Sequence, residues 1–117
     1  MARTLLVGPD GPRPLPTGAL VGVVGCLTQN ASREWVMTRA SEAARVRVGD
    51  DISPGEASAA SAAARGTRTF TLQNVGDGGT TLPPSGHKVL VKGALRQRAG
   101  ASRIYVTAAK SVAATCD

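Results

Sequence analysis

Two cysteines stand far apart in this chain of 117 residues: Cys26 closes the first apolar run, and Cys116 is the penultimate residue. A disulfide between them would tie the first strand to the last and enclose nearly the whole fold. Small domains bury little apolar surface, which limits their stability. A cross-link over this length would add roughly 4 to 5 kcal/mol of stability, because it lowers the conformational entropy of the unfolded chain. The alternative is two unpaired thiols, with Cys26 a small buried hydrophobe and Cys116 at a frayed end.

Five segments carry apolar residues at the two-residue period of a β-strand. They cover residues 19–27, 34–40, 67–73 and 88–95, and the fifth begins near Arg103. The first two segments are separated by a short polar turn, so we expect them to pair as a hairpin. The pattern predicts an all-β fold, a small five-stranded OB-like Greek-key barrel.

The core of this barrel must be aliphatic, because the chain has one Trp, one Tyr and one Phe. In the first and fourth strands both faces are largely apolar. Glycines within the first strand indicate the sharp bend or bulge that closes small barrels. Side chains expected to point inward from the other strands are Trp35, Met37, Phe70, Leu72, Ile104 and Val106.

The chain divides into a Pro- and Gly-rich lead-in, residues 1–18, and a barrel domain, residues 19–117. Within the lead-in, residues 3–7 are a candidate short strand. An insertion rich in Ala, Ser and Arg separates the second and third strands at 41–66. The connection over 74–86 is rich in Gly and Pro and leaves room for no more than a turn.

The insertion has two interpretations. Ser53 and Glu56 have the spacing of a capping box, which predicts a short helix over 57–65 that ends at Gly66. Its Ala and Ser bias fits a mobile loop equally well. Before this point, Val46 and Val48 are candidates for continuing the second strand.

Fourteen Lys and Arg residues against eight acids give a net charge of +6, so a general attraction to polyanions is expected. The charges are scattered, and only Arg96, Arg98 and Arg103 form a local group. We expect weak, salt-sensitive and sequence-blind binding, since Tyr105 is the one ring predicted to face outward. The candidate polyanion-binding residues are Arg39, Arg68, Lys92, Arg103 and Tyr105.

No catalytic or metal-binding pattern stands out. His87 has no acid or nucleophile partner recognisable from sequence, and Asp50 and Asp51 are adjacent rather than spaced as a facing pair. Two cysteines and one histidine without short spacing do not form a zinc motif. The sequence therefore predicts neither an enzyme nor a cofactor.

Several motifs follow one another in a distinctive order: Gly25-Cys26-Leu27, Trp35-Val36-Met37-Thr38, Phe70-Thr71-Leu72, the stretch from Gly86 to Gly93, and the stretch from Val106 to Cys116. This order resembles a group of small bacterial exported proteins with an OB-like barrel and no assigned activity. The group has a Gly-Cys-Leu strand, a late Gly-His-x-Val-x-Val-x-Gly strand and a closing cysteine. The resemblance covers about residues 19–117 and implies that Cys26 pairs with Cys116.

Compartment and function follow as expectations. No segment approaches the roughly 20 apolar residues that span a bilayer, and the first residues lack the apolar core of an export signal. A periplasmic or secreted protein with a removed or omitted leader is expected, and a cytoplasmic protein is the alternative. We expect a non-catalytic binding or accessory module of the bacterial envelope. The alternative is a single-stranded nucleic-acid binder that uses a basic outer face.

Overall fold

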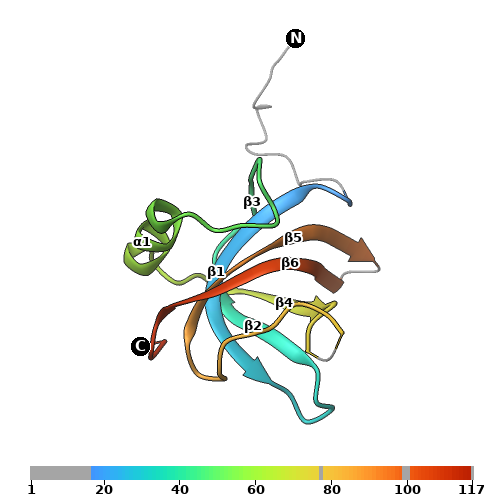
Figure 1. The fold of residues 1–117 in the computed structure, drawn as a ribbon. Helices are drawn as coiled ribbons and strands as arrows, with labels where there is room; N and C mark the ends of the chain where they lie inside the picture. The colour runs from blue at the N-terminus through green and yellow to red at the C-terminus, as the bar shows by residue number, and fades with distance from the viewer. Residues whose placement is uncertain (1–16, 77, 99–100, 117) are drawn as a thin grey trace.

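The computed structural model describes residues 17–76, 78–98 and 101–116. The candidate strand over 3–7 lies outside these residues. The elements, in chain order, are β1 (Leu20–Gln29), β2 (Trp35–Ala40), β3 (Ala44–Arg45), α1 (Pro54–Ala62), β4 (Arg68–Gln73), β5 (Lys88–Arg98) and β6 (Ala101–Ala113) (Figure 1). All five predicted strands are therefore present, and the fourth extends three residues beyond its predicted end at Leu95.

The strands form one six-stranded mixed sheet in which five close into a ring. Around the ring the order is β1, β2, β4, β6 and β5, and β5 pairs with β1 again. The pairing between β4 and β6 is parallel, and the other pairings are antiparallel. The sheet is thus curved back on itself, with β1 and β2 forming the expected hairpin (Figure 1).

The sixth strand, β3, was not predicted. It is two residues long and pairs with the start of β1 rather than extending β2, which ends at Ala40. Val46 and Val48 follow β3, so the expectation that they continue the second strand is wrong. The Val46 amide donates to the Leu20 carbonyl, and Val48 is 52% exposed.

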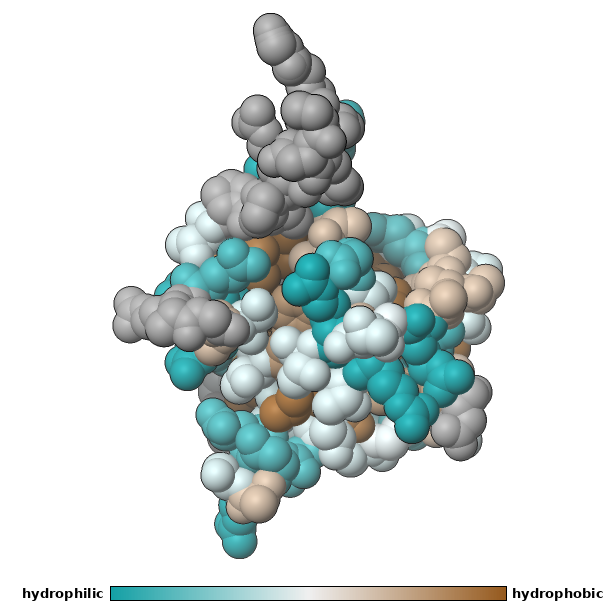
Figure 2. All heavy atoms as spheres, turned by 180° about the vertical axis from the view of Figure 1, so that it is seen from behind, coloured by the Kyte–Doolittle hydropathy of each residue, from teal (hydrophilic) through white to brown (hydrophobic). Residues whose placement is uncertain are grey.

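The interior of the ring is filled by the alternate aliphatic side chains. The central cluster is Ala19, Val21, Val23, Leu27, Met37, Ala40, Phe70, Leu72, Val89, Val91, Leu95, Ile104 and Val106. Trp35, expected inward, is partly buried and packs against this cluster. On the face shown in Figure 2, hydrophilic and intermediate side chains predominate, and strongly apolar atoms are visible only in small recessed areas.

A bulge at Thr107 keeps the long strand β6 in phase with the core. Gly93 pairs with Val106 and Lys92 pairs with Ala108, so Thr107 has no partner on β5. The extra residue lets Val106 and Ala109, which differ in parity, both pack against the core. The strands approach closely here, because a Cβ on Gly93 would overlap the Tyr105 carbonyl oxygen.

A second close approach occurs at Gly25, where β1 bends past the end of β2. A Cβ at this position would lie 2.9 Å from both the Ala40 Cα and the Thr38 carbonyl oxygen. Both atoms belong to backbone, so the strands would have to separate. Gly25, one of the glycines of the first strand, is therefore required by this close approach of β1 to β2.

We expect Gly25→Ala to lower the free energy of unfolding by about 1 to 3 kcal/mol, the usual range for overpacking a tight contact. The matched control is Gly55→Ala in α1, where the new Cβ would meet only the Ser53 hydroxyl at 3.9 Å. The control should be neutral or slightly stabilising, since alanine favours helix. Urea unfolding measures both changes, and a Gly25→Ala protein as stable as the parent would contradict the close approach.

The insertion contains a helix, so its mobile-loop interpretation is not supported. Ser53 and Glu56 form the expected capping box, with Pro54 in the first turn. The helix ends at Ala62 rather than at residue 65, because Ala63 is already extended. Gly66 instead lies against β2, where its amide donates to the Arg39 carbonyl at 2.9 Å.

The helix packs on the outer face of β5 and β6 and reaches Val24 of β1. Its one buried residue, Ala60, packs with Val24 and Leu90, and Ile52 and Val112 border this second, small apolar cluster. Figure 1 shows α1 at the side of the ring, apart from the tip of β5 and β6. The insertion therefore covers the outer surface away from the tip of β5 and β6.

Candidate functional site

Lys92, a predicted polyanion-binding residue, is buried beneath the insertion. Its side chain is 1% exposed, and Nζ donates at 2.9 Å to each of the carbonyls of Val48 and Asp51. The Glu56 carboxylate lies 2.6 Å from the same Nζ. Lys92 lies on the outward face of β5, as the alternation predicted, but the insertion covers that face. The ammonium is thus saturated and cannot contact a phosphate.

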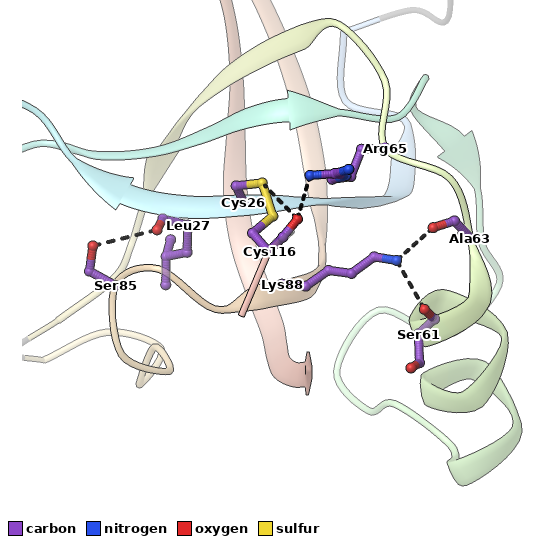
Figure 3. Close-up of a disulfide and its surroundings, with 8 residues drawn as sticks. All are labelled: Cys26, Leu27, Ser61, Ala63, Arg65, Ser85, Lys88 and Cys116. Carbon is purple, nitrogen blue, oxygen red and sulfur yellow. Dashed lines mark hydrogen bonds between the residues drawn. A yellow bond between two sulfur atoms is a disulfide. The ribbon is translucent and has the colours of Figure 1, made fainter. Parts of the chain in front are cut away.

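Lys88 holds the other end of the helix. Its Nζ donates to the carbonyls of Ser61 at 2.9 Å and Ala63 at 2.6 Å (Figure 3). The carbonyls at a helix C-terminus have no partner within the helix and carry the negative end of its dipole, so a cation is favoured there. The two lysines of β5 consequently attach both ends of α1 to the sheet.

The disulfide joins Cys26 of β1 to Cys116, with 5.5 Å between the two Cα atoms. Since β5 separates β6 from β1 in the ring, the segment after β6 crosses β5 to reach Cys26. Arg65 fixes this crossing by donating from Nη1 to the Cys116 carbonyl at 2.6 Å (Figure 3). The predicted link between the first and last strands is confirmed, and it lies beside the C-terminus of α1.

The Glu56 carboxylate makes the stability of the contact between α1 and β5 depend on pH. The hydrogen bond from Lys92, followed by that from the Ser53 backbone, lowers the pKa of Glu56 below its usual value. A carboxyl group whose pKa is lower in the folded than in the unfolded state stabilises the fold at pH values above the unfolded-state pKa. This stabilisation is lost as the pH falls through the folded-state pKa.

We therefore expect stability to decline on acidification below the usual carboxyl range, and Glu56→Gln to reduce the slope of that decline. Urea midpoints measured from pH 7 to pH 3 test this expectation. Glu34→Gln, in the turn between β1 and β2, is the control, because Glu34 makes no ion pair with a described residue. Identical slopes in the parent and Glu56→Gln proteins would contradict the role of Glu56.

Two further predicted polyanion-binding residues, Arg68 and Arg39, are not part of a shared binding site. Arg68 donates from Nε and Nη2 to the two oxygens of Glu42, both at 2.8 Å, and this pair lowers the pKa of Glu42 and raises that of Arg68. Arg39 is exposed on β2 with a φ of 49°, next to an irregularity in the pairing with β4. Arg68 is thus already engaged by an acid.

Arg103 and Tyr105 do come together, and Arg96 joins them. Arg103 on β6 is the direct register partner of Arg96 on β5, and Tyr105 lies two residues further along the same face. The Arg96 guanidinium lies 5.2 Å from the centroid of the Tyr105 ring, within cation–π range. Within the described residues, neither arginine has an acidic partner.

These arginines border a groove of about 440 Å³. The groove lies where the end of β5 meets the start of β6, the end of β4 and the residues preceding β1. Its lining residues are Thr17, Gly18, Gln73, Ala94, Arg96, Gln97 and Arg103. We take this groove, together with the adjoining Tyr105, as the candidate site and call it the arginine groove.

Sequence reasoning missed the two glutamines of the arginine groove. Gln73 ends β4 and pairs with Tyr105 across the parallel contact. Its Oε1 is buried and accepts no hydrogen bond from any residue that the structure describes. The alternation that places Phe70 and Leu72 inward also places Gln73 outward, so the sequence contained a signal for its position. Its position beside Arg103 needed the register of β4 and β6.

His87 has a hydroxyl partner that the sequence did not reveal. Its Nδ1 lies 2.7 Å from the Ser111 Oγ, which in turn lies 3.3 Å from the Ala113 carbonyl oxygen. A hydroxyl has one proton, so Ser111 donates either to the Ala113 carbonyl or to an unprotonated Nδ1, according to the tautomer of His87.

Comparison with protein-family models, curated proteins and solved structures gives no match to this chain. No helix in the described part of the chain has the length and hydropathy needed to cross a membrane. Across the same residues, no cluster of three or more His, Cys, Asp or Glu side chains has the arrangement of a metal site. Function is therefore inferred from the arginine groove itself.

Proposed function

We propose that this chain is a non-catalytic, OB-like binding module of the bacterial envelope that holds an anionic ligand in the arginine groove. The observation that carries the proposal is the pair Arg96 and Arg103, which face each other across β5 and β6 without an acid among the described residues. Like charges directly opposite in a sheet destabilise it. An anion bound between the two guanidiniums would remove this repulsion.

The OB-like part of the proposal is supported by the ring order and by the parallel contact between β4 and β6, which suit a Greek-key barrel. The envelope location is supported by the disulfide, since such bonds persist in oxidising compartments. It agrees with the resemblance to exported proteins that the Gly-Cys-Leu strand and the closing cysteine suggest.

Binding of a flexible polyanion, polyaspartate, tests the proposal. We expect the affinity to fall as salt rises from 50 to 200 mM, and Arg103→Ala to weaken binding at least fivefold at the lower salt. Lys110→Ala is the control, because Lys110 is an exposed cation near the other end of β6. Equal losses in the two variants would indicate diffuse attraction to net charge and would contradict the assigned site.

The second candidate function is single-stranded nucleic-acid binding in the cytoplasm. It is favoured by Tyr105, which is 40% exposed beside two arginines, because bases stack on such rings. Two measurements separate the candidates: the redox state of the cysteines in the producing cell, and the affinity for an oligothymidylate. Reduced cysteines and submicromolar oligonucleotide affinity at physiological salt would favour the nucleic-acid candidate.

A further inference from the structure

The arginine groove contains more than positive charge, and its individual groups restrict the ligand. Arg96 and Arg103 are register partners, so their guanidiniums extend from neighbouring positions on one face of the sheet. The planar fork of a guanidinium matches the two oxygens of a carboxylate or phosphate group. The pair is thus suited to one compact anionic group rather than to a distributed charge.

Gln73 adds a requirement that an anion alone does not meet. Its buried Oε1 accepts no hydrogen bond from a described residue, and an oxygen of this kind needs a donor. Ionised carboxylates and fully deprotonated phosphate oxygens only accept hydrogen bonds. Gln97 borders the groove through its backbone, which is bonded to the Thr17 hydroxyl, because its side chain points to the opposite face of β5 from Arg96. A ligand that satisfies Gln73 must carry a hydroxyl or N–H group beside its anionic group.

The aromatic ring at the groove is only partly accessible. Arg96 lies over one face of Tyr105, at 5.2 Å from the ring centroid, so this face is not open to a base. Tyr105 is the one exposed large aromatic side chain in the part of the chain that the structure describes. Single-stranded nucleic-acid sites normally use several open ring faces. The groove therefore favours a ligand that offers hydroxyl donors over one that binds by stacking its bases on aromatic rings.

We infer that the arginine groove binds a hydroxylated anion: a carboxylate or phosphate group carried on a sugar unit, as in an acidic polysaccharide. Arg96 and Arg103 hold the anionic group, and Gln73 binds a neighbouring hydroxyl. The volume of about 440 Å³ is within the usual range of small-ligand sites. This inference rests on the proposed function and specifies the ligand class of the same site.

Calorimetric titration with four probes tests the ligand class. Trigalacturonic acid carries three carboxylates and hydroxyls, tricarballylate carries three carboxylates without hydroxyls, and galactotriose carries hydroxyls without charge. Oligothymidylate represents nucleic acid. We expect trigalacturonic acid to bind at least fivefold more tightly than each of the others at equal salt. Glucose 6-phosphate against inorganic phosphate then shows whether a phosphate can replace the carboxylate.

Two variants assign the contacts. Gln73→Met should weaken trigalacturonic acid binding at least fivefold, because the side-chain amide is lost while the side-chain size is kept. The ratio of the affinity for trigalacturonic acid to that for tricarballylate should fall. Arg103→Lys keeps the charge but loses the fork, and should weaken both carboxylate probes. Lys110→Ala should leave all affinities unchanged.

The outcomes separate this inference from the proposed function. Equal affinities for trigalacturonic acid and tricarballylate, both dependent on Arg103, would overturn the hydroxylated ligand and leave the anion site standing. Tighter binding of oligothymidylate would overturn it in favour of nucleic acid. Anion binding that Arg103→Ala does not weaken would overturn both proposals.

Discussion

Replacing both cysteines with alanine is expected to lower the free energy of unfolding by roughly 4 to 5 kcal/mol, the largest effect of any change considered for this chain. The disulfide closes a loop with a sequence separation of 90 residues, and the chain-entropy model gives this magnitude for a loop of that length. Small domains have total stabilities of about 5 to 15 kcal/mol. The Cys26→Ala, Cys116→Ala double variant should therefore be close to its unfolding threshold at 37 °C.

Urea unfolding of the oxidised protein, the reduced protein and the double variant measures this loss. The reduced protein and the double variant should agree, and reductant should leave the double variant unchanged. Arg65→Ala is a useful companion, because it removes only the hydrogen bond to the Cys116 carbonyl. Two titratable thiols under non-reducing, denaturing conditions, or a loss below about 1 kcal/mol, would contradict the role assigned to the disulfide.

Lys92→Met is expected to be the most damaging single change at an ionisable residue. Methionine fills similar volume but leaves the Val48 and Asp51 carbonyls without their donor. A fully buried unsatisfied group costs about 1 to 3 kcal/mol, and these two hydrogen bonds are partly buried. The ion pair to Glu56 is lost as well. Entry of water would satisfy part of this need, so we expect a total loss of about 2 to 4 kcal/mol.

The matched control is Lys110→Met, which removes an exposed lysine from the strand next to β5, opposite Leu90. It should change stability by no more than about 0.5 kcal/mol. Hydrogen exchange adds a local reading, because Lys92→Met should accelerate exchange in α1 before it affects the core strands. Equal stability of the two variants would show that Lys92 does not attach the insertion.

The ring of strands could be predicted because a strand buried on one face has to alternate. Phe70 and Leu72 point inward and Thr69 and Thr71 do not, and this pattern is local in the sequence. The start of α1 was also local, since the capping box needs only Ser53 and Glu56. The end of α1 was missed because Gly66 is bound by β2, a contact made across the fold.

The site was less predictable for the same reason. Alternation places Lys92 on the outer face of β5, and it does not reveal that the insertion covers that face and buries the ammonium. The cluster of Arg96 and Arg103 around a turn was visible in the sequence. The addition of Gln73 depended on the parallel register between β4 and β6, which has no local sequence signature.

Chemical-shift mapping during titration with trigalacturonic acid is the most direct test of the claim that the arginine groove is the binding site. The account predicts that the shifted backbone amides cluster around Gln73, Arg96, Gln97 and Arg103, with little change around α1 or the disulfide. Shifts spread over the cations of the β1–β2 turn and the insertion, or shifts centred on His87, would contradict it.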